Sequence, residues 1–246
     1  MFRTSNPALS DKAFDESRED FHGGAVMTSQ GAVNKSFILV GILVIVAGFA
    51  WEMVRTNPAV AMPALIGAAI AGFVLSLVCI FVKKSAPITA PLYAMAQGVV
   101  IGSISFMFNQ QYAGIVFNAV VLTIGVLAAM LILYKTGIIK VTQKFAMCIA
   151  AATGAIMITY LLSFVLSFFG MGFGFIHGSG WFGIGFSVVV VIVAALNLAL
   201  DFDFIEKGGK MNLPKYMEWY AAFGLLVTLV WLYLEILRLL AKLQRR

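Results

Sequence analysis

Seven long apolar stretches most strongly limit what this chain can fold into. They occupy residues 36–53, 59–82, 88–108, 113–134, 145–169, 181–203 and 217–241. A helix of about 20 residues crosses a hydrocarbon core of roughly 30 Å. Backbone groups in lipid must be paired within a helix or a closed barrel, and these stretches lack the alternation of barrel strands. The sequence therefore predicts an all-α, polytopic bundle of seven transmembrane helices.

The composition agrees with a membrane domain that follows a polar tail. Of the 246 residues, 61% are hydrophobic and only 11% are charged, which is unusual for a soluble globular protein. Residues 1–35 hold five of the eleven acidic residues and lack the apolar core of a cleavable signal peptide. We therefore expect a flexible tail at 1–35 and a membrane domain at 36–246, with the first helix as the insertion signal.

Basic residues predict the orientation, because lysine and arginine are retained in cytoplasmic loops. Twelve lie in the tail and the loops of one side, whereas the opposite loops hold Arg55 alone. The N-terminus is therefore expected in the cytoplasm. The basic C-terminal tail conflicts with a seventh full crossing, which we nevertheless favour. The net charge of +6 follows from this loop pattern and suits anionic lipid headgroups, not nucleic acid.

Motifs for catalysis or metal binding are missing from the sequence. Cys79 and Cys148 lie in predicted helices, where they serve as small apolar residues. His22 and His177 are far apart in the predicted topology and have no metal-ligand spacing. The glycine-rich segment Gly170–Gly183 lacks the Lys-Ser/Thr of a phosphate loop. We expect no enzymatic activity, no metal site and no cofactor.

Acidic residues in the membrane region gather in the last two predicted helices, except for Glu52 near the first loop. A charge in mid-bilayer is costly, so such residues normally face the bundle interior and have a function. Asn197 and Asp201 are four residues apart and share a helix face, whereas Asp203 is rotated by about 200° from Asp201. We therefore expect Asp201 to point inward and Asp203 to face a neighbouring helix or the headgroups.

Glu218 is the expected partner of Asp201, because both lie toward the cytoplasmic ends of adjacent antiparallel helices. Two carboxyl groups within a few Å do not readily ionise together, so such a pair shares a proton and senses pH. The alternative is that these acids are solvated at the membrane surface and paired with lysines of residues 207–215. Glu235 and Arg238 have the spacing of an ordinary helical ion pair.

The third predicted helix contains APLYAMAQGVVIGSIS, residues Ala90–Ser105. This stretch resembles a signature of the transmembrane Bax inhibitor motif (Bax inhibitor-1) family, in its bacterial branch. Residues Phe117–Phe145 and the acidic end of the sixth predicted helix are similar to that family as well. The resemblance implies seven helices around a central last helix, a pH-dependent calcium leak, a cytoprotective role and a place in the bacterial inner membrane.

The resemblance also implies site residues. In the family, one aspartate in the sixth helix and one in the seventh are implicated as the pH sensor, and an arginine of the second helix is a latch. Asp201 matches the first aspartate, although the usual Asp-Thr-Gln reads Asp-Phe-Asp here. The seventh predicted helix lacks the matching aspartate. We expect Glu218 to take its place, because Glu218 is predicted to lie at a similar depth in the membrane to Asp201. Lys83 or Lys84 would replace the latch arginine.

These observations lead to a main hypothesis and two alternatives. The main one is a pH-sensitive ion leak or channel that conducts calcium across the bilayer. The first alternative is a non-conducting regulator that binds another membrane protein, such as a quality-control protease, through the tail and the small-residue face of Ala94, Gly98 and Gly102. The second is a proton-coupled transporter, which requires a saturable solute.

Overall fold

The computed structural model of the chain describes residues 25–167, 169, 178 and 180–245. In this part of the chain there is no β-strand, and seven helices are long and apolar enough to cross a membrane. These helices are α2 (Ser29–Thr56), α3 (Ala61–Phe81), α4 (Ala86–Gln111), α5 (Ile115–Lys135), α6 (Gln143–Ser167), α8 (Trp181–Lys210) and α9 (Met217–Gln244). The short 3-10 turns η2 (Pro58–Val60) and η3 (Lys83–Ser85) flank α3. The predicted all-α, seven-helix fold is confirmed.

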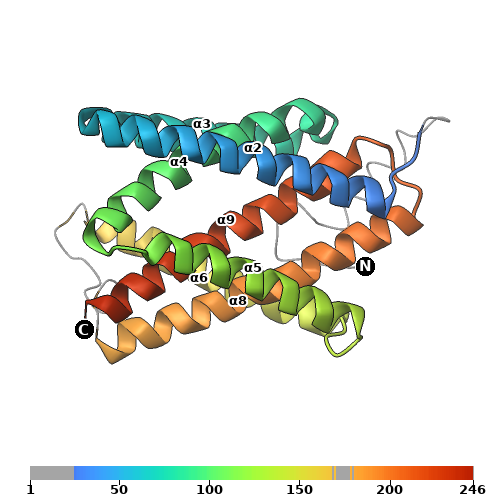
Figure 1. The fold of residues 1–246 in the computed structure, drawn as a ribbon. Helices are drawn as coiled ribbons and strands as arrows, with labels where there is room; N and C mark the ends of the chain where they lie inside the picture. The colour runs from blue at the N-terminus through green and yellow to red at the C-terminus, as the bar shows by residue number, and fades with distance from the viewer. Residues whose placement is uncertain (1–24, 168, 170–177, 179, 246) are drawn as a thin grey trace.

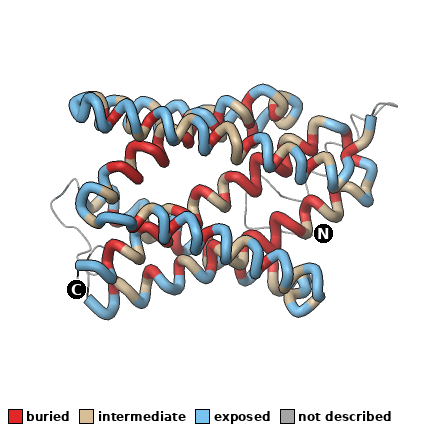
Figure 2. The backbone as a smooth tube through the Cα atoms, in the orientation of Figure 1, coloured by how far each residue is buried: buried red, intermediate tan, exposed pale blue. Residues whose placement is uncertain are grey.

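Helix α9 lies at the centre of the bundle. It packs against α8, α2, α4 and α5 and is buried along most of its length. Figure 1 shows it between one group formed by α2, α3 and α4 and another formed by α5, α6 and α8. In Figure 2 the buried residues concentrate on α4, α8 and α9, whereas α2 and α3 are exposed on their outer faces. Its buried residues are mostly apolar, with Glu218, Glu235 and Lys242 as the charged exceptions.

Small residues bring α4 close to α2. A Cβ atom added at Gly98 would lie 2.8 Å from the carbonyl oxygen of Leu43, and one added at Gly102 would lie 2.3 Å from that of Ala47. Any larger residue at these positions would push the two backbones apart. The small-residue face of α4 therefore serves helix packing within the bundle.

Helix α2 begins at Ser29, seven residues before the first predicted helix. The hydroxyl of Thr28 accepts a hydrogen bond of 2.9 Å from the Gly31 N–H, so Thr28 caps the helix although its first turns are polar. The predicted tail boundary at residue 35 is therefore too late. The remainder of that tail, residues 1–24, and both histidines lie outside the described residues.

The helix ends define two ends of the bundle. We call the end where α2 and α9 begin and α8 finishes the latch end, and the opposite one the far end. Helix α9 runs from the latch end to the far end, so the last helix passes through the whole bundle, as expected (Figure 1). At the latch end the segment before α2 lies along the α8–α9 connection, where Met27 N donates to Leu213 O at 2.6 Å.

Candidate functional site

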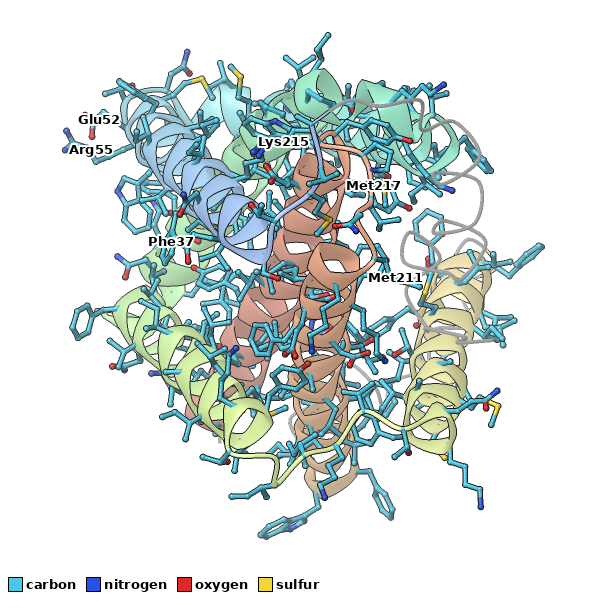
Figure 3. All side chains as sticks on the ribbon, turned by 90° about the vertical axis from the view of Figure 1, so that its right-hand side faces the viewer. Phe37, Glu52, Arg55, Met211, Lys215 and Met217 are labelled. Carbon is cyan, nitrogen blue, oxygen red and sulfur yellow. The ribbon has the colours of Figure 1, made fainter. Side chains whose placement is uncertain are left out.

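Glu218, the second residue of α9, joins this helix to the start of α2. Its side chain is fully buried, and its carboxylate forms ion pairs with Lys35 of α2 and, at 2.8 Å, with Lys215. The same carboxylate accepts hydrogen bonds from the backbone N–H of Thr28 at 2.9 Å and from its hydroxyl at 3.0 Å. Figure 3, viewed from the latch end, shows Lys215 at the start of α9 beside α2. We call Thr28, Gly31, Lys35, Lys215 and Glu218 the Glu218 latch.

Gly31 provides the space for this carboxylate. A Cβ atom at Gly31 would lie 2.1 Å from Glu218 Oε1, which is far inside van der Waals contact. The first turn of α2 has no acidic residue of its own, so Glu218 supplies the negative charge that the N–H groups of a helix start favour. The latch therefore depends on a glycine, a helix start and two lysines at once.

The two lysines differ in exposure, and this difference decides how much each ion pair with Glu218 contributes to stability. The side chain of Lys35 is 17% exposed, whereas that of Lys215 is 51% exposed. Water and salt screen an exposed ion pair, which typically contributes between roughly 0 and 1 kcal/mol. The less exposed Lys35 also lies 5.5 Å from the centre of the Trp219 ring. Lys35 is therefore the main interhelical partner of Glu218.

Asp201 and Asn197 both face the bundle interior, as predicted, with exposures of 1% and 4%. The amide of Asn197 donates to the hydroxyl of Thr153 on α6 at 2.9 Å and so ties α8 to α6. The predicted pairing of Asp201 with Glu218 does not match the contacts of Glu218, which run to α2 and to Lys215. The reason is depth: α8 continues for nine residues, about 13 Å, beyond Asp201, whereas Glu218 lies at the start of α9.

Asp203 and Glu206 form ordinary helical ion pairs near the end of α8. Asp203 pairs with Lys207 at 2.5 Å and Glu206 with Lys210 at 2.6 Å. Glu206 also accepts a hydrogen bond of 3.0 Å from the Tyr134 hydroxyl on α5. The sequence offered the alternative that these acids pair with the lysines that follow them. For Asp203 and Glu206 this pairing is confirmed.

The predicted latch residues Lys83 and Lys84 lie in η3, which touches α9 from the α3–α4 connection. The lysines that bind Glu218 are instead Lys35 and Lys215. In the sequence, Lys35 stands just before the first predicted helix, where it indicates only the orientation of the chain. Its position about two turns after the capping Thr28 is the local signal that places it on the helix.

A second polar cluster surrounds Glu235 at the far end. Its carboxylate is 2% exposed and accepts hydrogen bonds of 3.0 Å from the Tyr160 hydroxyl of α6. Arg238 pairs with Glu235 at 2.9 Å, which confirms the predicted helical ion pair, and its guanidinium lies 5.2 Å from the centre of the Tyr160 ring. Glu235 is thus bound by one residue of its own helix and one of α6.

Lys242 lies one turn beyond Arg238 on α9 and connects this cluster to α8. It is 5% exposed and donates to the carbonyl of Gly183 at 3.0 Å and to the hydroxyl of Ser187 at 2.8 Å. We call Tyr160, Ser187, Glu235, Arg238 and Lys242 the far-end clamp. Among the described residues, no group of three or more His, Cys, Asp or Glu side chains could hold a metal ion.

Comparison with known proteins identifies the family. The sequence model of the family described as Bax inhibitor 1 like matches residues 6–245. No curated protein and no solved structure gives a significant match. Together with seven helices of membrane-spanning length, the match identifies an integral, multi-pass membrane protein. Because it covers nearly the whole chain, this protein belongs to the Bax inhibitor 1 like family.

Proposed function

We propose that this protein is a pH-responsive cation leak that conducts calcium, and that the Glu218 latch controls whether α2 stays against α9. The family provides the general association with ion leak and cytoprotection. The observation that carries the proposal is a wholly buried carboxylate bound by a lysine from a different helix. Such a contact depends on charge, and a proton can remove the charge.

The direction of the pH response follows from the charges of the latch. Ionised Glu218 attracts Lys35 and Lys215 and accepts both hydrogen bonds from Thr28. Protonation removes the negative charge and leaves two ammonium groups around a neutral acid, so they repel each other. Acid therefore weakens the contact between α2 and α9 and favours the open state.

The next carboxylate inside the bundle is Asp201 on α8. It lies about 13 Å of helix from the end of α8, and Asn197 is one turn deeper on the same face. Buried acidic and amide side chains of membrane helices commonly line ion pathways. We assign Asp201 the role of attracting the cation after it has passed the latch, with Asn197 as its polar neighbour.

Calcium-loaded liposomes containing the purified protein test both roles across a series of pH values. Glu218→Gln should leak at neutral pH as fast as the wild type does in acid, whereas Asp201→Asn should leak more slowly at every pH. Glu52→Gln is the matched control, because Glu52 pairs with Arg55 on an exposed surface. If Glu218→Gln and Asp201→Asn both behave like the wild type at every pH, the mechanism is wrong.

The same assay separates the other function classes. A folded wild type that carries no ion flux at any pH would favour the non-conducting regulator. Flux that saturates with a particular solute would favour a transporter. Neither result would affect the membrane fold or the family assignment.

A further inference from the structure

A long groove runs between α2 and α5. Its volume is about 770 Å³, and its floor comes from α4, α8 and α9. The walls are apolar: Val40 and Val44 belong to α2, and Val120 and Ile124 belong to α5. The groove extends from Trp51 toward Ser29, so it follows most of the length of α2. This groove is separate from the Glu218 latch, whose carboxylate does not line it.

The groove opens on a surface that a bilayer would cover. Phe37, Val44 and Ile124 on its rim are 75%, 60% and 60% exposed, and both helices are long and apolar enough to span a membrane. Figure 3 places Phe37 on the side of α2 that faces α5. Water gains few hydrogen bonds in an apolar groove, and an empty groove forfeits dispersion contacts. A hydrocarbon chain is the occupant that satisfies this lining.

One end of the groove carries polar groups with surplus positive charge. Ser29, Tyr134, Lys135 and Glu206 line this end. The Glu206 carboxylate is already paired with Lys210 at 2.6 Å and bonded to Tyr134. In the described part of the chain, no ion pair engages Lys135.

A second lysine without an ion pair in that part of the chain, Lys140, lies in the connection after α5. It lines an adjoining cavity of about 430 Å³ together with Lys135. Two carboxylates also line this cavity, but Asp203 is paired with Lys207 and Glu206 with Lys210. Ammonium groups at the membrane surface attract anionic headgroups. An apolar groove that ends at two lysines therefore matches a lipid with a negatively charged phosphate.

We propose that this groove binds one acyl chain of an anionic phospholipid, with the lipid phosphate at Lys135 and Lys140. The lipid would complete the wall between α2 and α5, where the protein leaves an apolar gap lined by both helices. The inference stands on the groove and its charges, and it does not depend on ion conduction.

Native mass spectrometry of the full chain released from nanodiscs tests the acyl-chain site. The nanodiscs contain equal amounts of phosphatidylglycerol and phosphatidylcholine. Gly48 lines the groove and Gly67 lies on α3 outside it, and a Cβ atom at either position would meet nothing within 4 Å. We expect Gly48→Trp to reduce the retained phosphatidylglycerol adduct about tenfold, because the indole fills the groove. Gly67→Trp should retain the adduct of the wild type.

The headgroup contact is tested in the same discs with Lys135→Gln, and Lys144→Gln is the control at an exposed lysine of α6. Loss of one lysine should reduce the preference for phosphatidylglycerol over phosphatidylcholine about fivefold. An adduct that survives in Gly48→Trp would overturn the groove as the lipid site, and an unchanged preference in Lys135→Gln would overturn the phosphate contact. A dimer that Gly48→Trp dissociates would show that a second copy covers the groove instead.

Discussion

The two ends of α9 hold a buried glutamate by different means. At the latch end, the ion pair of Glu218 reaches another helix through Lys35. At the far end, the ion pair of Glu235 stays within α9 through Arg238, and the bond to another helix comes from the neutral hydroxyl of Tyr160. Both carboxylates are almost completely buried, with exposures of 0% for Glu218 and 2% for Glu235.

This difference indicates which end can respond to a proton. Protonation of Glu218 would remove an attraction between α2 and α9, so it would affect their relative position. Protonation of Glu235 would weaken a pair within one helix, while Lys242 would still hold α9 to α8 through Gly183 and Ser187. We therefore expect the latch end to move and the far end to act as the anchor about which it moves.

The largest effect is expected from Gly31→Ala, which breaks the latch without changing any charge. The new Cβ atom would lie 2.1 Å from Glu218 Oε1, so the carboxylate must leave its site. We expect a loss of about 3 kcal/mol in unfolding free energy, within the range for breaking a buried ion pair, and calcium flux at neutral pH. Unfolding in detergent and liposome flux measure these two quantities.

Gly41→Ala is the matched control for that experiment. Gly41 lies in the same helix, and a Cβ atom there would meet nothing within 4 Å. Its stability and flux should equal those of the wild type. A Gly31→Ala protein that remains closed at neutral pH would show that the latch does not control the leak.

A smaller effect is expected from the lysines, and their order is informative. Lys35→Met should cost about 2 kcal/mol, because it removes the less exposed partner of a buried carboxylate. Lys215→Met should cost less than about 1 kcal/mol, because its side chain is 51% exposed and screened by water. Flux at neutral pH should rise in the same order. Equal effects of the two substitutions would contradict the assignment of Lys35 as the interhelical partner.

Tyr160→Phe weakens the far-end clamp and should leave the pH response unchanged. The substitution removes the hydroxyl that donates to Glu235, at an expected cost of about 1 kcal/mol. Thermal unfolding should register the loss, while the midpoint of flux against pH stays that of the wild type. Tyr112→Phe, which loses an exposed contact with Arg245, serves as the control. A shifted midpoint in Tyr160→Phe would remove the distinction between the two ends.

The smallest effect is expected from Glu52→Gln at the far end of α2. Glu52 and Arg55 form an ion pair with side chains 53% and 60% exposed. Exposed pairs contribute little because both partners are solvated when apart. Unfolding and flux should both match the wild type. A clear change would mean that surface charge, and not burial, determines the behaviour of acids in this bundle.

Local features of the candidate site could be predicted from the sequence. The four-residue spacing of Asn197 and Asp201 placed both on the buried face, and the three-residue spacing of Glu235 and Arg238 gave their ion pair. Such contacts follow from helix geometry alone. The partner of Glu218 could not be obtained in this way, because Lys35 is 183 residues distant along the chain.

The sequence by itself determined that seven apolar helices form and that the buried acids gather in the last two. Those properties follow from the cost of exposing polar backbone or unpaired charge to lipid, which acts on each segment separately. Only the tertiary structure decided that Gly31 and Lys35 meet Glu218, and that α2 and α5 enclose an apolar groove. These contacts depend on how the helices pack against α9, and packing geometry is not encoded in the pattern of any single helix.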